Sequence, residues 1–121
     1  MPTFLYGFGY EDKDEMEYNR RTDSDFESST GVFIDAPSEA DALAWGREIS
    51  EAFLRHAHGD PAVSWKALDY AHWIEADPAS CSWKHCLSFF PRVRVGELPD
   101  FSRMTPEAYA DWSREHESRD A

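Results

Sequence analysis

The sequence predicts an α+β fold, in which a mainly antiparallel four-stranded sheet carries two main helices packed on one face. Short apolar segments with strand character alternate with longer segments that have helical spacing and helix-start signals. A length of 121 residues is typical of one domain, and 15% aromatic residues supply large apolar side chains for a core. We therefore expect a single globular domain over residues 1–121, with the order β-β-α-(α)-β-(α)-β-α, where parentheses mark short helices.

Two strands are predicted in the first 35 residues. Residues 3–10 place an aromatic side chain at every second position, which is the period of a strand. Residues 31–35 form a short apolar run, which favours a second strand. Residues 11–30 then form an acidic connection between the two strands. We expect this connection to be a long hairpin loop or to extend both strands with polar ends.

A helix over residues 38–57 has the clearest sequence signals. Ser38 follows Pro37 and is a favourable N-cap, and Asp41 stands three residues later, at the capping-box position. Apolar residues then recur at intervals of three and four, which gives the helix one apolar face. Gly59 marks its end, because glycine readily adopts the left-handed conformation that follows many helices.

Five more elements are predicted after residue 60. An Asp-Pro pair, which favours a helix start, precedes each of two short helices. Aromatic and β-branched residues favour one strand, the alternation Arg-Val-Arg-Val favours another, and Thr-Pro-Glu favours a final helix start. The elements are a short helix over 61–68, a strand over 69–76, a helical turn over 78–87, a strand over 92–95 and a helix over 105–117, followed by a tail over 118–121 that we expect to be frayed.

The charge balance restricts the kinds of partner. The chain has 24 acidic and 12 basic residues, a net charge of −12, and the first 60 residues alone hold 14 acidic and 5 basic residues. Such an excess of carboxylates argues against nucleic acid or an anionic membrane as the main partner. No apolar run approaches the length of a membrane span, the first residues do not resemble a secretion signal, and there are two cysteines. We expect a cytoplasmic protein with reduced thiols.

The acidic connection is the leading candidate for a binding surface. It combines carboxylates, which attract a basic partner, with aromatic side chains, which provide contact area. The predicted partner-binding residues are Glu11, Asp12, Asp14, Glu15, Glu17, Tyr18, Asp23, Asp25, Phe26 and Glu27. The pattern predicts a small acidic, non-enzymatic protein that binds a basic protein partner in an inhibitor, immunity-type or adaptor role. The alternative interpretation of such a charge run is a solvated surface loop.

A metal site is the alternative function. Cys81, His85 and Cys86 lie within six residues, and Cys81 and His85 would share one face if this segment were helical. His56 or His58 would complete a zinc site. The spacing matches no established zinc motif, which favours the alternative interpretation of a cysteine that fills the core and an exposed His85.

Other motifs are incomplete. Residues 23–34 begin like a calcium-binding loop but have Ser28 and Ile34 where glycine and glutamate are required. The pair Gly7 and Gly9 lacks the third glycine and the following helix of a phosphate-binding loop. No complete catalytic or cofactor motif is present, which favours a binding function without a cofactor.

Overall fold

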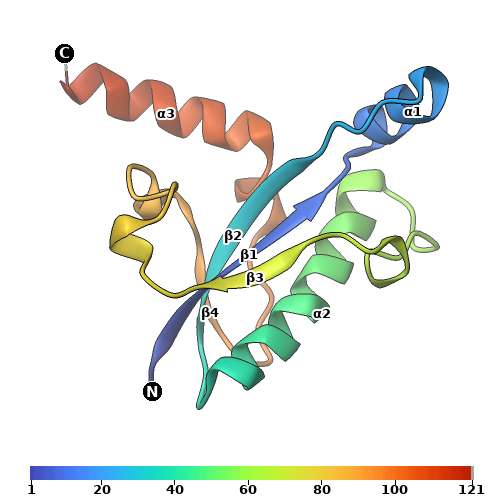
Figure 1. Ribbon diagram of the computed structural model, residues 1–121. Helices are drawn as coiled ribbons and strands as arrows, with labels where there is room; N and C mark the ends of the chain where they lie inside the picture. Colours follow the sequence, from blue (N-terminus) through green and yellow to red (C-terminus); the bar gives the residue numbers. More distant parts are fainter. Residues whose placement is uncertain (121) are drawn as a thin grey trace.

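A computed structural model describes the backbone of residues 1–120 and the side chains of residues 1–116. Its centre is a four-stranded sheet in the order β3-β1-β2-β4 (Figure 1). The strands are β1 (Thr3–Tyr10), β2 (Ser28–Asp35), β3 (His72–Glu75) and β4 (Arg92–Arg94). β1 pairs antiparallel with β2 and β3, whereas β2 pairs parallel with β4. The predicted α+β class with four strands is therefore confirmed, but the sheet is mixed rather than purely antiparallel.

The two longer helices lie on different sides of this sheet (Figure 1). α2 (Glu39–His58) packs against the buried aromatic side chains of β1. α3 (Pro106–Asp120) belongs to the opposite side, where Tyr109 and Trp112 lie against the ring of Phe89 at centroid distances of 5.3 and 5.9 Å. The prediction that both main helices pack on one face is wrong, because the aromatic residues of α3 contact the segment that covers the second face.

Close packing between α2 and β1 depends on a glycine. Tyr6 is fully buried beneath α2, and its hydroxyl lies 2.8 Å from Oγ of Ser50. A Cβ atom on Gly46 would lie 2.4 Å from the ring of Tyr6. The helix can approach the strand at this point only because residue 46 has no side chain. Phe8 continues the same core and meets Phe53 edge to face at 5.5 Å.

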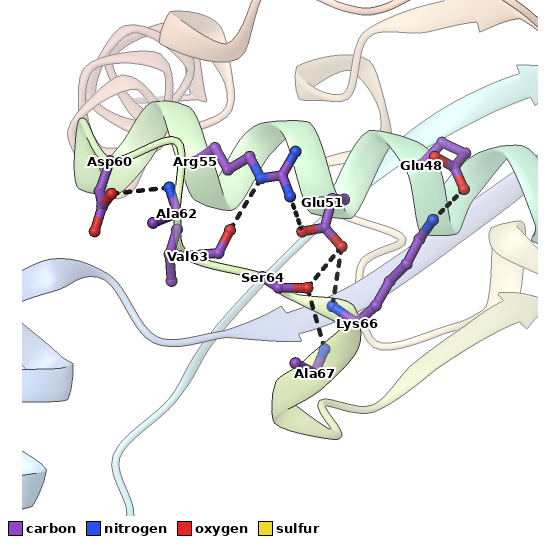
Figure 2. Close-up of polar contacts among 9 residues, drawn as sticks. All are labelled: Glu48, Glu51, Arg55, Asp60, Ala62, Val63, Ser64, Lys66 and Ala67. Carbon is purple, nitrogen blue, oxygen red and sulfur yellow. Dashed lines mark hydrogen bonds and ion pairs between the residues drawn. The ribbon is translucent and has the colours of Figure 1, made fainter.

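The loop after α2 is fixed to the outer face of that helix (Figure 2). Glu51 accepts hydrogen bonds from the Ser64 hydroxyl at 3.1 Å and the Lys66 backbone N–H at 3.3 Å, and it pairs with Arg55 at 3.2 Å. Arg55 also donates to the carbonyl oxygen of Val63 at 2.9 Å. These bonds hold the loop so that the buried indole of Trp65, which follows, donates to the carbonyl oxygen of Gly9 in β1.

Most predicted elements are present, with three differences. The predicted strands over 3–10, 69–76 and 92–95 and the helices over 38–57 and 105–117 correspond to β1, β3, β4, α2 and α3, and the strand over 31–35 lies within β2. The short helices over 61–68 and 78–87 are wrong in extent: the structure has single 3₁₀ turns at Lys66–Leu68, Pro78–Ser80 and Leu87–Phe89. The acidic connection, expected to lack a helix, contains α1 (Lys13–Thr22).

The side chains of residues 117–120 and the whole of residue 121 lie outside the part of the chain that the structure describes. The frayed tail that we expected over 118–121 falls on these residues. Among the helices of residues 1–120, none combines the length and the apolar character needed to cross a membrane.

Candidate functional site

The helix α1 forms although its sequence is strongly polar. Asp12 is its N-cap: the carboxylate accepts a hydrogen bond from the Glu15 backbone N–H at 2.7 Å, and the Glu15 carboxylate accepts one from the Asp12 N–H at 3.1 Å. Acidic residues occupy the first turn and basic residues the last turn, which matches the helix dipole. Asp23 ends the helix in the left-handed conformation, with φ of 54°. The spacing of Asp12 and Glu15 is the sequence signal that could have revealed this helix.

A buried asparagine joins α1 to the segment that follows it. The Asn19 side chain donates to the carbonyl oxygen of Phe26 at 2.7 Å and accepts from the Phe26 N–H at 3.0 Å. It also donates to the carboxylate of Glu11 at 2.6 Å. Glu11 in turn accepts from the hydroxyl of Tyr70 at 2.8 Å, and His58 Nε2 lies 2.8 Å from its backbone oxygen. We call residues 11–28, held in this way to the rest of the domain, the acidic arm.

The predicted partner-binding residues fall into two groups on the acidic arm. Glu11, Asp12 and Glu15 are half-buried and engaged in the hydrogen bonds just described. Their carboxylates position the arm. The other five acidic residues are exposed to solvent; they are Asp14, Glu17, Asp23, Asp25 and Glu27.

The exposed carboxylates of the acidic arm are not neutralised by neighbouring bases. Within the part of the chain whose side chains are described, the ion pairs join other acids to bases, and no acid of residues 11–27 takes part in one. The segment 11–27 holds eight acidic and three basic residues, so it stays negative. Partial burial, followed by the charges of nearby carboxylates, raises the pKa of Glu27 above its usual range. The arm is therefore a concentration of uncompensated negative charge.

Two aromatic side chains lie among these charges. Tyr18 and Phe26 are 42% and 59% exposed, and their ring centroids are 5.7 Å apart. Arg21 lies over the Tyr18 ring, 5.7 Å from its centroid. The two rings together form a small exposed apolar patch on the acidic arm. Adjacent exposed apolar side chains are more informative about binding than apolar side chains scattered singly over a surface.

The structure separates the residues of the predicted metal site. A second, smaller hydrophobic core on the other face of the sheet is formed by the buried residues Leu5, Cys86 and Phe90. The Cys86 thiol in this second core lies 3.4 Å from the carbonyl oxygen of Trp83. His85 is exposed, with Nε2 3.5 Å from the Tyr109 hydroxyl. His56 and His58 belong to α2, on the opposite face of the sheet.

The local backbone and the surroundings of the cysteines also disfavour that metal site. Residues 78–87 are not an α-helix, so Cys81 and His85 do not stack as a helical pair. Burial raises the pKa of the Cys86 thiol and disfavours the thiolate that binds metals. Among the described residues, no group of three or more potential ligands is placed to hold a metal ion.

Beside the second core, a cleft of about 400 Å³ opens between β2 and the start of α3. Trp83, Phe89 and Tyr109 supply aromatic walls, and Ser29 and Thr30 line the β2 side. Ser28, the last residue of the acidic arm, also lines this cleft, together with Ser29 and Thr30 that follow it. The cleft was not predicted, because its walls come from segments far apart in the sequence.

Replacing Asn19 with alanine is expected to lower the free energy of unfolding by about 1–3 kcal/mol, because buried hydrogen-bonding groups lose their partner. Urea denaturation measures this change. The matched control is Arg20→Ala, an exposed neighbour on the same helix, for which we expect a change within about 0.5 kcal/mol. Equal effects of the two substitutions would contradict the structural role assigned to Asn19.

Comparisons with protein-family models, with curated proteins and with solved structures find no match to this chain. The assignment of a function therefore depends on the acidic arm and the cleft.

Proposed function

We propose that this protein is a non-enzymatic binding protein whose acidic arm docks a basic segment of a partner protein, in an inhibitor, immunity-type or adaptor role. The observation that carries the proposal is a group of five exposed carboxylates that make no ion pair among the described side chains and share a short segment with an exposed aromatic pair. Carboxylates used only for solubility have no need of an adjacent apolar patch. A binding surface needs both charge and apolar area.

The two features would act in different steps of binding. The negative field of the arm attracts a cationic partner and accelerates the encounter, an effect that salt weakens. Tyr18 and Phe26 offer flat apolar area of the kind that supplies most of the energy at protein interfaces. The buried Asn19 holds Phe26 in place before the partner arrives, which reduces the entropy lost on binding.

The cysteines support an intracellular setting for this proposed role. Both Cys81 and Cys86 are free thiols in the structure. Free thiols are typical of proteins in a reducing compartment, so we place the binding function in the cytoplasm.

Replacing Glu27 with glutamine is expected to leave the stability of the folded protein at pH 7 unchanged or slightly increased. The raised pKa of Glu27 means that folding disfavours its charged form, so its contribution to stability declines as pH rises through that pKa. At pH 7 we expect the variant to be as stable as the original protein or slightly more stable, by no more than about 0.5 kcal/mol, with no difference at pH 3. Thermal unfolding at the two pH values measures this. A less stable variant at pH 7 would contradict the account of Glu27.

The experiment that tests the proposal is calorimetric titration with a basic probe. The probe is an octapeptide with blocked ends in which lysine alternates with phenylalanine. We expect binding that weakens at least about tenfold between low salt and about 0.5 M salt, because the Debye length shrinks over this range. Binding that does not change with salt, or no binding of the probe, would overturn the proposal.

A further inference from the structure

The cleft beside the second core is lined by aromatic rings at different depths. Tyr10 and Phe90 are buried and belong to its floor, whereas Trp83, Phe89 and Tyr109 are half-buried and form its walls. The volume of about 400 Å³ lies within the range of cavities that hold small molecules. The proposed function uses the acidic arm and leaves this cleft without a role.

The rings that line the cleft are steeply inclined to one another. The planes of Phe89 and Tyr109 meet at 86°, with their centroids 5.3 Å apart. Those of Trp83 and Phe90 meet at 53°, and those of Phe89 and Phe90 at 66°. A flat ligand is held best between two parallel planes, and none of these three pairs is near parallel. Inclined walls suit a compact, rounded group, such as several methyl groups around one atom.

The cleft lies in a negative electrostatic field. Among the described side chains, those that line it include no lysine, arginine or carboxylate. A smaller hollow of about 190 Å³ shares three residues with the cleft, and three carboxylates and one lysine line that hollow. Burial, followed by the negative charges of Glu15, Asp12 and Glu107, raises the pKa of Tyr10. The field therefore reaches the floor of the cleft, where it favours a cationic ligand over an anionic one.

We propose that the cleft binds a small molecule with a quaternary ammonium group, whose methyl groups contact the ring faces of Trp83, Phe89 and Tyr109. The negative face of an aromatic ring attracts a cation, and this attraction is strongest where water is excluded. A quaternary ammonium ion has no N–H to donate, so it needs no hydrogen-bond acceptor in an apolar cavity, whereas a buried primary ammonium does. This inference goes beyond the proposed function and does not depend on it.

Calorimetric titration of the whole chain with three matched ligands tests this inference. Choline carries the quaternary ammonium group, its carbon isostere is a neutral alcohol of the same shape, and ethanolamine keeps the charge without the methyl groups. We expect choline to bind at least about fivefold tighter than either, because choline alone combines the charge with the apolar methyl surface. A smaller preference over either ligand, or no binding of choline at about 10 mM, would overturn the quaternary ammonium site.

Substitutions on α3 locate the choline site. Tyr109 and Trp112 are both half-buried and both contact the ring of Phe89, but of the two residues Tyr109 lines the cleft and Trp112 does not. Tyr109→Leu keeps apolar bulk and removes the ring, so we expect choline to bind at least about fivefold more weakly. Tyr109→Phe, which keeps the ring, and the matched control Trp112→Leu are expected to bind choline within about twofold of the original protein. Equal effects of Tyr109→Leu and Trp112→Leu would overturn the assignment to this cleft.

The proton spectrum of choline provides a second measurement, on the unsubstituted protein, that does not depend on whether a variant folds. Protons above the face of an aromatic ring resonate upfield of their free position, whereas protons at the ring edge resonate downfield. We expect the methyl resonance of choline to move upfield, in a saturable manner, as the protein is added. A downfield change, or no change under conditions where calorimetry shows saturation, would overturn the contact with the ring faces.

A last arm of the experiment separates a free ligand from a modified protein, because trimethylated lysine carries the same group. The probe is the lysine–phenylalanine octapeptide with one lysine trimethylated. We expect trimethylation to change the affinity of the octapeptide by less than about fivefold, since a cavity of this size suits a small molecule. A larger gain would overturn the assignment to a small molecule. Failure of the unmodified octapeptide to bind would overturn the role of the acidic arm and leave the choline result unaffected.

Discussion

Phe8→Ala is expected to lower the free energy of unfolding by about 3–5 kcal/mol, the largest effect on stability that we predict. The Phe8 side chain is fully buried in the core between α2 and β1. Its ring lies 5.5 Å from that of Phe53 and 6.2 Å from that of Trp65, both edge to face. The substitution removes buried apolar area, removes these aromatic pairs and leaves a cavity that the rigid sheet cannot fill. Because domains of this size have a net stability of about 5–15 kcal/mol, a substantial part of the stability would be lost.

Phe26→Ala is the matched control for that prediction. The same side chain is removed, but from a position that is 59% exposed on the acidic arm. We expect the free energy of unfolding to change by no more than about 0.5 kcal/mol. Chemical denaturation followed by tryptophan fluorescence measures both variants. A loss of less than about 1 kcal/mol for Phe8→Ala would contradict the packing described here.

Neutralising three exposed acids of the arm is expected to weaken binding of the lysine–phenylalanine probe about tenfold or more at low salt. The variant combines Glu17→Gln, Asp25→Asn and Glu27→Gln. Each exposed charge pair contributes about 0.2–1 kcal/mol to binding. Three losses near the middle of that range add to about 1.5–2 kcal/mol, which raises the dissociation constant about tenfold or more. Asp14 and Asp23 are kept, because Asp14 lies in the first turn of α1 and Asp23 ends the helix.

A variant with the same change in net charge serves as the control for this effect. It combines Glu39→Gln, Asp77→Asn and Glu115→Gln, three exposed acids outside the arm that take part in no ion pair among the described side chains. We expect this variant to bind the probe within about twofold of the original protein, because charges far from the contact are screened. If both variants weaken binding equally, the probe responds to net charge and the arm has no special role.

The main helix α2 shows what local sequence signals can predict. Its predicted range, 38–57, differs from the observed Glu39–His58 by one residue at each end, since Ser38 and Gly59 define the ends through local hydrogen bonds. Strand β1 was equally predictable, because its aromatic side chains occupy every second position and all face the core beneath α2. In both elements the local pattern and the tertiary packing agree.

The acidic arm was predicted as a charged segment but not as a helix. Helix prediction relied on an apolar stripe, and residues 13–22 have too few apolar side chains to form one. The capping box at Asp12 and Glu15 and the bond network of Asn19 stabilise the helix instead. The division of the carboxylates into engaged and exposed groups depends on that network, so composition alone could not predict it.

The position of α3 and the cleft depended on contacts between distant segments. Tyr109 and Trp112 share one side of α3, but the sequence does not indicate which face of the sheet they meet. Their partner, Phe89, lies just after the helical turn predicted over 78–87, in the 3₁₀ turn Leu87–Phe89. The cleft follows from this placement.

The most direct test of the central claim is a map of the probe-binding surface by amide chemical shifts. The protein is labelled with ¹⁵N and titrated with the lysine–phenylalanine octapeptide at low salt. We expect the largest shifts at residues 11–28, over the acidic arm, with small shifts in α2. Shifts concentrated on α2, or spread evenly over the surface, would contradict a partner-binding role for the acidic arm.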